Sequence, residues 1–421
     1  MFIIVLYFNS EKMKIVRIIC RIFTGMVFIF SGFVKGIDPW GFTYKLQDYF
    51  EAFHLDFLNG FAFPLAITAC TLELVIGLNL LTGIRMRITA WLLLLFMSFF
   101  TILTFILAIS NPVSDCGCFG DAIKLTNWQT FWKNIILLVP TIVVFWQRNN
   151  YKDLYACPAE WTLTLSFALL GVLLSVYCYH NLPLLDFLPY KTGTHIPDMM
   201  TVPEGMPADQ YETILVYEKD GVQKEFTAEN YPWQDSTWAW KETKHKLIRK
   251  GYEPPIHDFR ITSSGGLDIT EDLLQDTGYI FLVVAYDLSR PHRQAFEMLN
   301  IAAAGAQSLG YKYYLLTSST QEDMNAFRES FHPSYEICTA DEITLKTIIR
   351  SNPGIVLLRR GTILGKWHYR NFDYRQFRGQ QPDGVVLTLY RHSLEKNRIM
   401  LIAAILLLGL LIFNSQKAFE D

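Results

Sequence analysis

Long apolar runs constrain this chain more than any other feature. A transmembrane helix needs about 20 predominantly apolar residues, and hydrophobic residues make up 51% of the chain against 18% charged ones. Runs of this kind predict membrane-spanning helices at roughly 15–34, 61–82, 86–110, 131–147, 161–180 and 397–413. The polar stretch near 185–392 is then a soluble region outside the bilayer.

The orientation follows from the positive charges near short loops, because cytoplasmic loops carry an excess of Lys and Arg. The residues that mark the inner side are Lys12, Lys14, Arg17, Arg21, Arg85, Arg87, Arg148 and Lys152. Arg391, Lys396 and Arg398, at the outer end of the last run, disagree with this assignment, but the five earlier runs agree with one another. We therefore expect a multi-pass protein of a bacterial inner membrane, with the soluble region in the periplasm.

Two cysteines one residue apart, in "DCGCFGD", lie in a loop on the same outer side. Exported compartments are oxidising, so outer thiols are expected to be paired or redox-active. A disulfide between Cys116 and Cys118 would close a very small ring, and strained bridges turn over readily. Two other interpretations stay open at this point, namely small buried side chains and capture of Cu(I), since zinc requires more ligands.

One acidic residue, Glu73, lies near the middle of the second predicted span, where a charge costs about 2.5–3.5 kcal/mol on insertion scales. Cys70, Glu73 and Gly77 share one helical face and should point into the bundle together. Glu73 is either a carboxyl that carries protons or contacts a cofactor, or a protonated side chain bonded to a neighbouring helix. Lys35, at the outer end of the first span, is expected to extend to the membrane interface.

The stretches "RIFTGMVFIFSGFVKGIDP", "LELVIGLNLLTG" and "DCGCFGD" resemble the DoxX and MauE group of four-helix membrane proteins over roughly 15–147. The CGCFG element is the specific part of this resemblance. In that group the MauE branch is associated with disulfide formation in exported proteins, alongside a thioredoxin-like partner. The resemblance implies that Cys116 and Cys118 form the membrane-side redox pair.

The outer region has two parts. Residues 190–250 begin as an extended linker, and "ETILVYEKDGVQKEF" predicts a hairpin about its Asp-Gly pair; the Trp-rich "YPWQDSTWAW" is expected to pack under it. From residue 254 strands and helices alternate, which favours an α/β sheet of mixed direction. This order resembles thioredoxin-like domains of the TlpA type over roughly 254–370, with Pro353 in the place of that fold's cis-proline.

The chain departs from active thioredoxins at the junction "AYDLSRPHR", where a Cys-x-x-Cys would lie at a helix N-terminus. No cysteine occurs between Cys178 and Cys338, so the domain is predicted to be redox-inactive. Cys338 is expected to be a buried structural residue. The groove beside Pro353 can still hold an extended peptide through backbone hydrogen bonds, and we expect Asp287, Asn352 and Pro353 to contact a partner.

The expected architecture is an all-α membrane bundle with an α/β thioredoxin-like soluble domain. Its divisions are an N-terminal extension at 1–14, a DoxX/MauE-like bundle at 15–182, a linker with a small hairpin at 183–253, the thioredoxin-like domain at 254–390 and a last helix at 397–413. The net charge of −3 and the lack of a long basic block exclude a nucleic-acid-binding role.

Two functions from different classes fit the sequence. In the first, Cys116 and Cys118 exchange disulfides with an exported protein or a partner redoxin, and the bundle passes electrons to a quinone near Glu73. In the second, the chain is a non-enzymatic scaffold that assembles other membrane subunits of an envelope complex. The CGCFG element favours the thiol–disulfide oxidoreductase, and the missing Cys-x-x-Cys favours the scaffold. The sequence identifies neither the electron acceptor nor the protein substrate.

Overall fold

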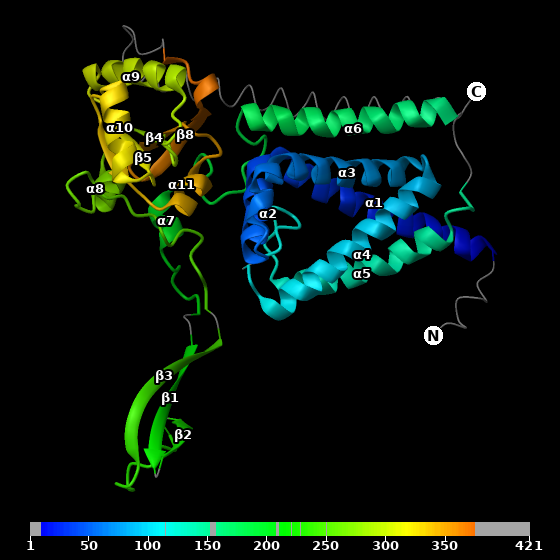
Figure 1. The fold of residues 1–421 in the computed structure, drawn as a ribbon, viewed down its shortest axis with the longest axis horizontal. Coiled ribbons are helices and arrows are strands. Elements are labelled where there is room, and N and C mark those ends of the chain that lie inside the picture. The colour runs from blue at the N-terminus through cyan, green and yellow to red at the C-terminus, as the bar shows by residue number, and fades with distance from the viewer. Residues whose placement is uncertain are drawn as a thin grey trace.

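A computed structural model describes residues 10–113, 115–151, 157–207, 210–219, 221–227, 229–249 and 251–374. Its N-terminal part is a helical bundle (Figure 1). The helices are α1 (Ser10–Ile37), α2 (Pro39–Ala52), α3 (Ala62–Thr82), α4 (Met86–Ser110), α5 (Asn127–Trp146) and α6 (Cys157–His180), with the 3-10 helix η2 (Asp56–Phe61) before α3. Within the described ranges, five helices are long and apolar enough to cross a membrane. The five N-terminal spans are thus confirmed, and the predicted helix at 397–413 lies outside the described residues.

Helix α2 lies between the predicted spans at 15–34 and 61–82, where no helix is predicted from the sequence. It begins where Asp38 accepts a hydrogen bond from Gly41 N and Pro39 occupies the first helical position, both of which favour a helix start. Figure 1 shows α2 across the end of the bundle that faces the soluble domain. This helix covers the ends of the spanning helices that are nearest to the soluble domain, including the end of α1.

Helices α1 and α3 pack closely through glycines. A β-carbon placed on Gly77 would lie 2.7 Å from Ile29 N and 2.8 Å from Gly25 O, and one on Gly32 would lie 2.7 Å from Leu74 N. Small residues let two membrane helices approach to backbone contact. The face of α3 that carries Glu73 is therefore pressed against α1, as the shared position of Glu73 and Gly77 predicts.

The soluble domain is an α/β sheet with helices on both faces. Its strands are β4 (Ile280–Val284), β5 (Lys312–Thr317), β6 (Glu336–Thr339), β7 (Gly354–Arg359) and β8 (Thr362–His368), in the order β6-β5-β4-β7-β8. Strands β4, β5 and β6 are parallel, β7 runs antiparallel to β4, and β8 runs antiparallel to β7. The helices are α7 (Ile196–Met200), α8 (Thr270–Gln275), α9 (Arg293–Ser308), α10 (Gln321–Phe331) and α11 (Glu342–Ile348), followed by η3 (Tyr369–Asn371).

Two hydrophobic clusters divide the core between the faces of this sheet. Phe281, Phe296 and Phe327 belong to the cluster under α9 and α10. Leu282 and Leu345 belong to the cluster on the face of α8 and α11. This three-layer arrangement, with parallel strands and a terminal antiparallel hairpin, is a thioredoxin-like fold and confirms the predicted fold class.

A three-stranded antiparallel arm projects from the domain (Figure 1). It consists of β1 (Gln210–Lys219), β2 (Val222–Thr227) and β3 (Ala239–Arg249), so the predicted hairpin is confirmed. The prediction that the Trp-rich stretch packs beneath it is wrong for Trp233 and Trp240, which are 71% and 58% exposed, whereas Trp238 does contact Phe226. The arm stands away from the larger sheet and from the bundle, so these two indole rings remain open to solvent.

Candidate functional site

The loop between α4 and α5 carries both cysteines, and we call residues 115–121 the CxC loop. Cys116 Sγ and Cys118 Sγ lie 3.0 Å apart as free thiols. Gly117 has φ +62°, a left-handed conformation that glycine adopts without the steric cost of a side chain. This turn brings the two sulfur atoms to the same side of the loop.

Hydrogen bonds from two helices hold the backbone of the CxC loop. Tyr49 of α2 donates its hydroxyl to the carbonyl of Cys116 at 2.5 Å, and Ser31 of α1 donates to the carbonyl of Cys118 at 2.9 Å. Lys45 of α2 forms an ion pair with Asp115 at 3.1 Å. Helix α2, which the sequence pattern did not reveal, therefore positions the thiol pair.

The two thiols differ in their electrostatic environment. The hydrogen bond from Cys116 lowers the pKa of Cys118; burial opposes this shift, and the ammonium groups of Lys133 and Lys35 add to it. The same hydrogen bond, together with burial, raises the pKa of Cys116. This environment favours the thiolate form of Cys118, and one proton between the two sulfur atoms, either of which can be the donor, would stabilise it.

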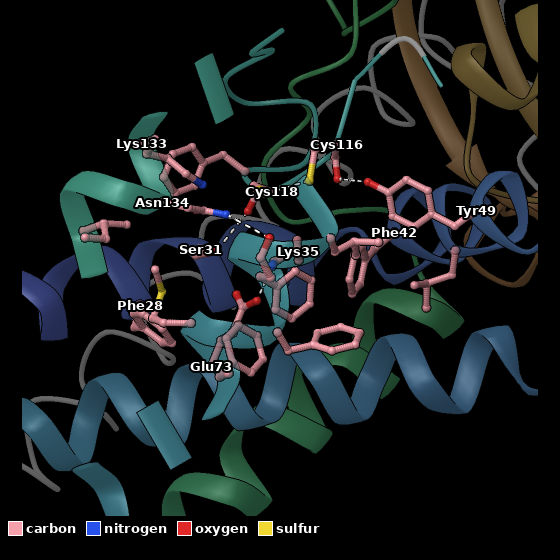
Figure 2. Close-up of a pocket in the computed structure, with 18 of the residues that line it drawn as sticks. Phe28, Ser31, Lys35, Phe42, Tyr49, Glu73, Cys116, Cys118, Lys133 and Asn134 are labelled. Carbon is pink, nitrogen blue, oxygen red and sulfur yellow. Dashed lines mark hydrogen bonds and ion pairs between the residues drawn. The ribbon is translucent and has the colours of Figure 1, made fainter. Parts of the chain in front are cut away.

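Both cysteines line an apolar cavity of about 230 Å³ inside the bundle (Figure 2). Its wall is mostly aromatic and aliphatic, and its few polar groups come from Ser31, Lys35, Glu73, Lys133 and Asn134. Lys133 lies 4.4 Å from the centroid of the Phe119 ring. A cavity that combines an apolar wall with a few polar groups is typical of sites for small organic molecules.

Lys35 and Glu73 form a buried ion pair in this cavity. The predicted interfacial position of Lys35 is wrong: its side chain is 4% exposed, lies 4.9 Å from the centroid of the Phe42 ring and turns inward, because α2 covers the end of α1. Lys35 is the group that offsets the charge of Glu73. Within the described residues, Glu73 Oε2 has no hydrogen-bond partner.

Asp287, Asn352 and Pro353 lie in the soluble domain and do not line the cavity with the cysteines. The Asn352–Pro353 peptide bond is cis, at the start of β7. Asn352 Nδ2 donates to the carbonyl of Asp287 at 2.9 Å, and the Asp287 side chain is exposed, whereas Pro353 is buried. Cys338 is buried in the sheet, as expected of a structural residue.

The soluble domain contacts the bundle beside the CxC loop. The Tyr286 hydroxyl lies 3.2 Å from that of Tyr44 in α2, and Arg350 contacts Asp38 and Asp121. Sequence reasoning missed Arg350, Asp38 and Asp121, because nothing in their local sequence indicates a contact across such a separation in the chain. Within the described residues, no group of three or more His, Cys, Asp or Glu side chains forms a candidate metal site.

Comparison with known proteins agrees with this arrangement. Residues 13–147 match the family model of the methylamine utilisation protein MauE, and residues 211–250 match a domain of unknown function, DUF8463. The match and the strand order indicate the class: residues 13–147 are similar to MauE, and they belong to a multi-pass membrane protein that also carries a thioredoxin-like domain.

Among individual proteins, Protein TlpB of Flavobacterium psychrophilum is 28% identical over 140 residues, which are 33% of this chain and 35% of TlpB. The match therefore spans about a third of that relative. The thioredoxin domain of a thiol-disulfide oxidoreductase from Bacteroides vulgatus aligns at 13% identity, with 32% of this chain and 91% of its own covered and a TM-score of 0.24. Copper-bound ScoI of Arabidopsis thaliana aligns at 15%, with 32% and 97% covered and a TM-score of 0.24.

Proposed function

We propose that the chain is a membrane thiol–disulfide redox protein that acts on exported proteins through Cys116 and Cys118. One observation carries this proposal: the two sulfur atoms lie 3.0 Å apart in the wall of an apolar cavity inside the helical bundle. A short movement of either sulfur would allow a disulfide to form. The match to the MauE model over 13–147 supports the same assignment.

The exchange itself needs only the two cysteines. A thiolate of an exported protein or a partner redoxin attacks the Cys116–Cys118 disulfide, and one sulfur leaves as a thiolate. The second substrate thiolate then attacks the mixed disulfide, so the substrate is oxidised and the pair is reduced to a dithiol. The stabilised sulfur of Cys118 is the better leaving group of the two, because thiols of lower pKa leave faster.

Reoxidation of the dithiol releases two electrons and two protons, and a quinone would supply an acceptor for both. The residues of the cavity fit such a molecule: the apolar wall suits its ring, and Glu73 Oε2, which has no hydrogen-bond partner among the described residues, would accept a hydrogen bond from a hydroxyl of the quinol that forms. Glu73 would pass a proton from the dithiol to the quinone, and Lys35 balances the charge of the carboxylate while it is ionised. Lys133 would donate a hydrogen bond to a carbonyl oxygen.

In this proposal the thioredoxin-like domain binds the partner protein. Asp287 is exposed at the strand–helix junction, and Asn352 and Pro353 lie directly beside it. The junction lacks cysteine, so the domain would bind a partner without exchanging disulfides with it. A redoxin or an exported protein held there would lie on the same side of the membrane as the CxC loop.

The first prediction concerns orientation, which we propose places the soluble domain in the periplasm. A cysteine introduced at Gly221 should react with a membrane-impermeant maleimide in cells whose outer membrane is permeabilised, and one introduced at Asn149 should react only after the inner membrane is lysed. Both sites lie in short connections, at the tip of the arm and after α5 respectively. The reverse pattern would place the domain in the cytoplasm, where a disulfide-forming role does not fit.

The second prediction tests the exchange. In a Cys116→Ser variant the serine hydroxyl can still donate to Cys118 Sγ. The Cys118 thiolate can run the exchange in reverse: it attacks the disulfide of an oxidised exported protein or redoxin, one sulfur of that protein leaves as a thiolate, and no Cys116 thiol remains to release the mixed disulfide. We expect this variant to accumulate mixed disulfides with exported proteins, visible as reducible high-mass species in non-reducing gels and identified by mass spectrometry. A Cys70→Ser control should give the wild-type pattern, because Cys70 is buried in α3. If the Cys116→Ser/Cys118→Ser variant captures the same species, the thiol pair is not the exchanging site.

A scaffold for other membrane subunits is the second candidate function. It is favoured by the lack of cysteine between Cys178 and Cys338 and by the contact between the soluble domain and the bundle. One measurement separates the two functions. A scaffold should still complement a deletion strain when both Cys116 and Cys118 are replaced by serine, whereas a thiol–disulfide redox protein should not.

A further inference from the structure

Arg350 is the centre of the contact between the two parts of the chain. Its side chain is 7% exposed and comes from the connection between α11 and β7, two residues before Asn352. Its Nε donates to both carboxylate oxygens of Asp38, at 3.2 and 3.0 Å. Its Nη2 donates to Asp121 Oδ2 at 3.0 Å, and its Nη1 donates to the carbonyl of Lys346 at 2.6 Å.

The two carboxylates that Arg350 binds belong to different elements of the redox site. Asp121 is the last residue of the CxC loop. Asp38 caps the start of α2, the helix whose Tyr49 bonds to the Cys116 carbonyl. One guanidinium group from the soluble domain therefore ties the end of the CxC loop to the helix that holds its first cysteine.

Charge explains why an arginine is required here. Burial raises the pKa of Asp121, and Arg350 opposes that shift. Burial alone would lower the pKa of Arg350, but Asp38 and Asp121 raise it above its ordinary value. A planar guanidinium can donate to both carboxylates at once, whereas the single ammonium of a lysine cannot reproduce this geometry.

The CxC loop separates two cavities. Gly117 and Arg350 line a polar cavity of about 460 Å³ between the soluble domain and the bundle. Cys116 and Cys118 line the apolar cavity on the other side. Because Asp121 is held from the polar side and Asp115 is held by Lys45 at the other end of the loop, the sulfur atoms are kept facing the apolar cavity.

We propose that Arg350 is a positioning residue for the redox pair: the thioredoxin-like domain holds the CxC loop in place from outside and keeps both sulfur atoms turned into the membrane cavity. The role of Arg350 in redox chemistry rests on the proposed thiol–disulfide exchange. Its role in holding the CxC loop in position does not depend on that exchange. The edge of the domain that carries Tyr286 and Arg350, next to the exposed Asp287, thereby serves as an internal contact. Its role is to orient thiols that belong to another part of the chain.

The test uses purified full-length protein in detergent, reduced beforehand, and a charged maleimide whose attachment to Cys118 is followed by site-resolved mass spectrometry. In an Arg350→Gln variant the loop should turn towards the polar cavity, and Cys118 should react about tenfold faster or more, as expected for the loss of charge-assisted hydrogen bonds. Arg350→Lys should restore protection only in part. Arg359→Gln is the matched control, because Arg359 lies in the same domain and donates to Thr277 and Tyr279 of that domain.

A second variant distinguishes loss of the contact to the CxC loop from unfolding of the soluble domain. Asp121→Asn leaves the bonds between Arg350 and Asp38 in place and weakens only the contact to the loop, so it should expose Cys118 while the limited-proteolysis pattern of the domain stays unchanged. The midpoint potential of the Cys116–Cys118 pair should shift in both variants and not in Arg359→Gln. If Cys118 reactivity is unchanged in Arg350→Gln and Asp121→Asn, the inference is wrong. If reactivity rises but the pair never forms a disulfide, the positioning stands and the proposed redox function fails.

Discussion

Replacing Glu73 with leucine is expected to destabilise the membrane bundle by about 3–5 kcal/mol, the usual cost of leaving one member of a buried ion pair without its partner. The ammonium of Lys35 would remain in a cavity whose wall is mostly apolar. The change in free energy of unfolding can be measured by titrating the reconstituted protein with denaturing detergent and following helix loss by circular dichroism.

The matched control for that variant is the double replacement Lys35→Leu/Glu73→Leu. Because both charges are then absent, most of the lost stability should return, as replacement of a buried ion pair by apolar residues is often neutral. Equal destabilisation of the single and double variants would show that the two side chains are not coupled. Such a result would also remove the basis for assigning Lys35 as the counter-charge of Glu73.

Gly77→Ala is expected to have the next largest effect. Its new β-carbon would lie 2.7 Å from the Ile29 nitrogen and 2.8 Å from the Gly25 carbonyl oxygen, and neither backbone atom can rotate away. Helices α1 and α3 must separate, at a cost of about 1–3 kcal/mol for overpacking. The same detergent titration measures this loss of stability.

Gly60→Ala is the control for the glycine contact, because a β-carbon there meets nothing within 4 Å. It should unfold like the wild type. A Gly77→Ala variant as stable as Gly60→Ala would mean that the two helices can part without loss of packing. In that case, the close packing of α1 and α3 would not be needed to position Glu73 next to Lys35.

The sequence predicted the spanning helices well, because an uninterrupted apolar run of bilayer length seldom forms anything but a membrane helix. It also identified Glu73, since a carboxylate in such a run is rare. The partner of Glu73 escaped detection: Lys35 lies at the end of its run, and only the short helix α2, which folds over that end, makes its position buried. Burial that depends on a second element cannot be recognised from the pattern of the first.

In the soluble domain, too, local features were predictable from the sequence and contacts between distant segments were not. Alternating strands and helices predicted the sheet and the position of Pro353 before β7, because these are local patterns. Arg350 looked like an ordinary charged residue between a helix and a strand. Its carboxylate partners, Asp38 and Asp121, lie more than two hundred residues earlier in the chain, and only the docking of the domain on the bundle brings them together.

The first and the last described residues of the soluble domain lie beside one place, the end of α6 that is nearer to this domain. Asn371 bonds to Asn181 at 2.7 Å, Arg370 contacts His180, and Lys366 pairs with Asp186 at 2.7 Å. A domain whose two ends adjoin can be gained or lost by its host without rearranging the host's helices. A bundle of this type without the domain would keep its helices but leave Asp38 and Asp121 without their cation, so a separate protein that works with it should bring a positive group to the same spot.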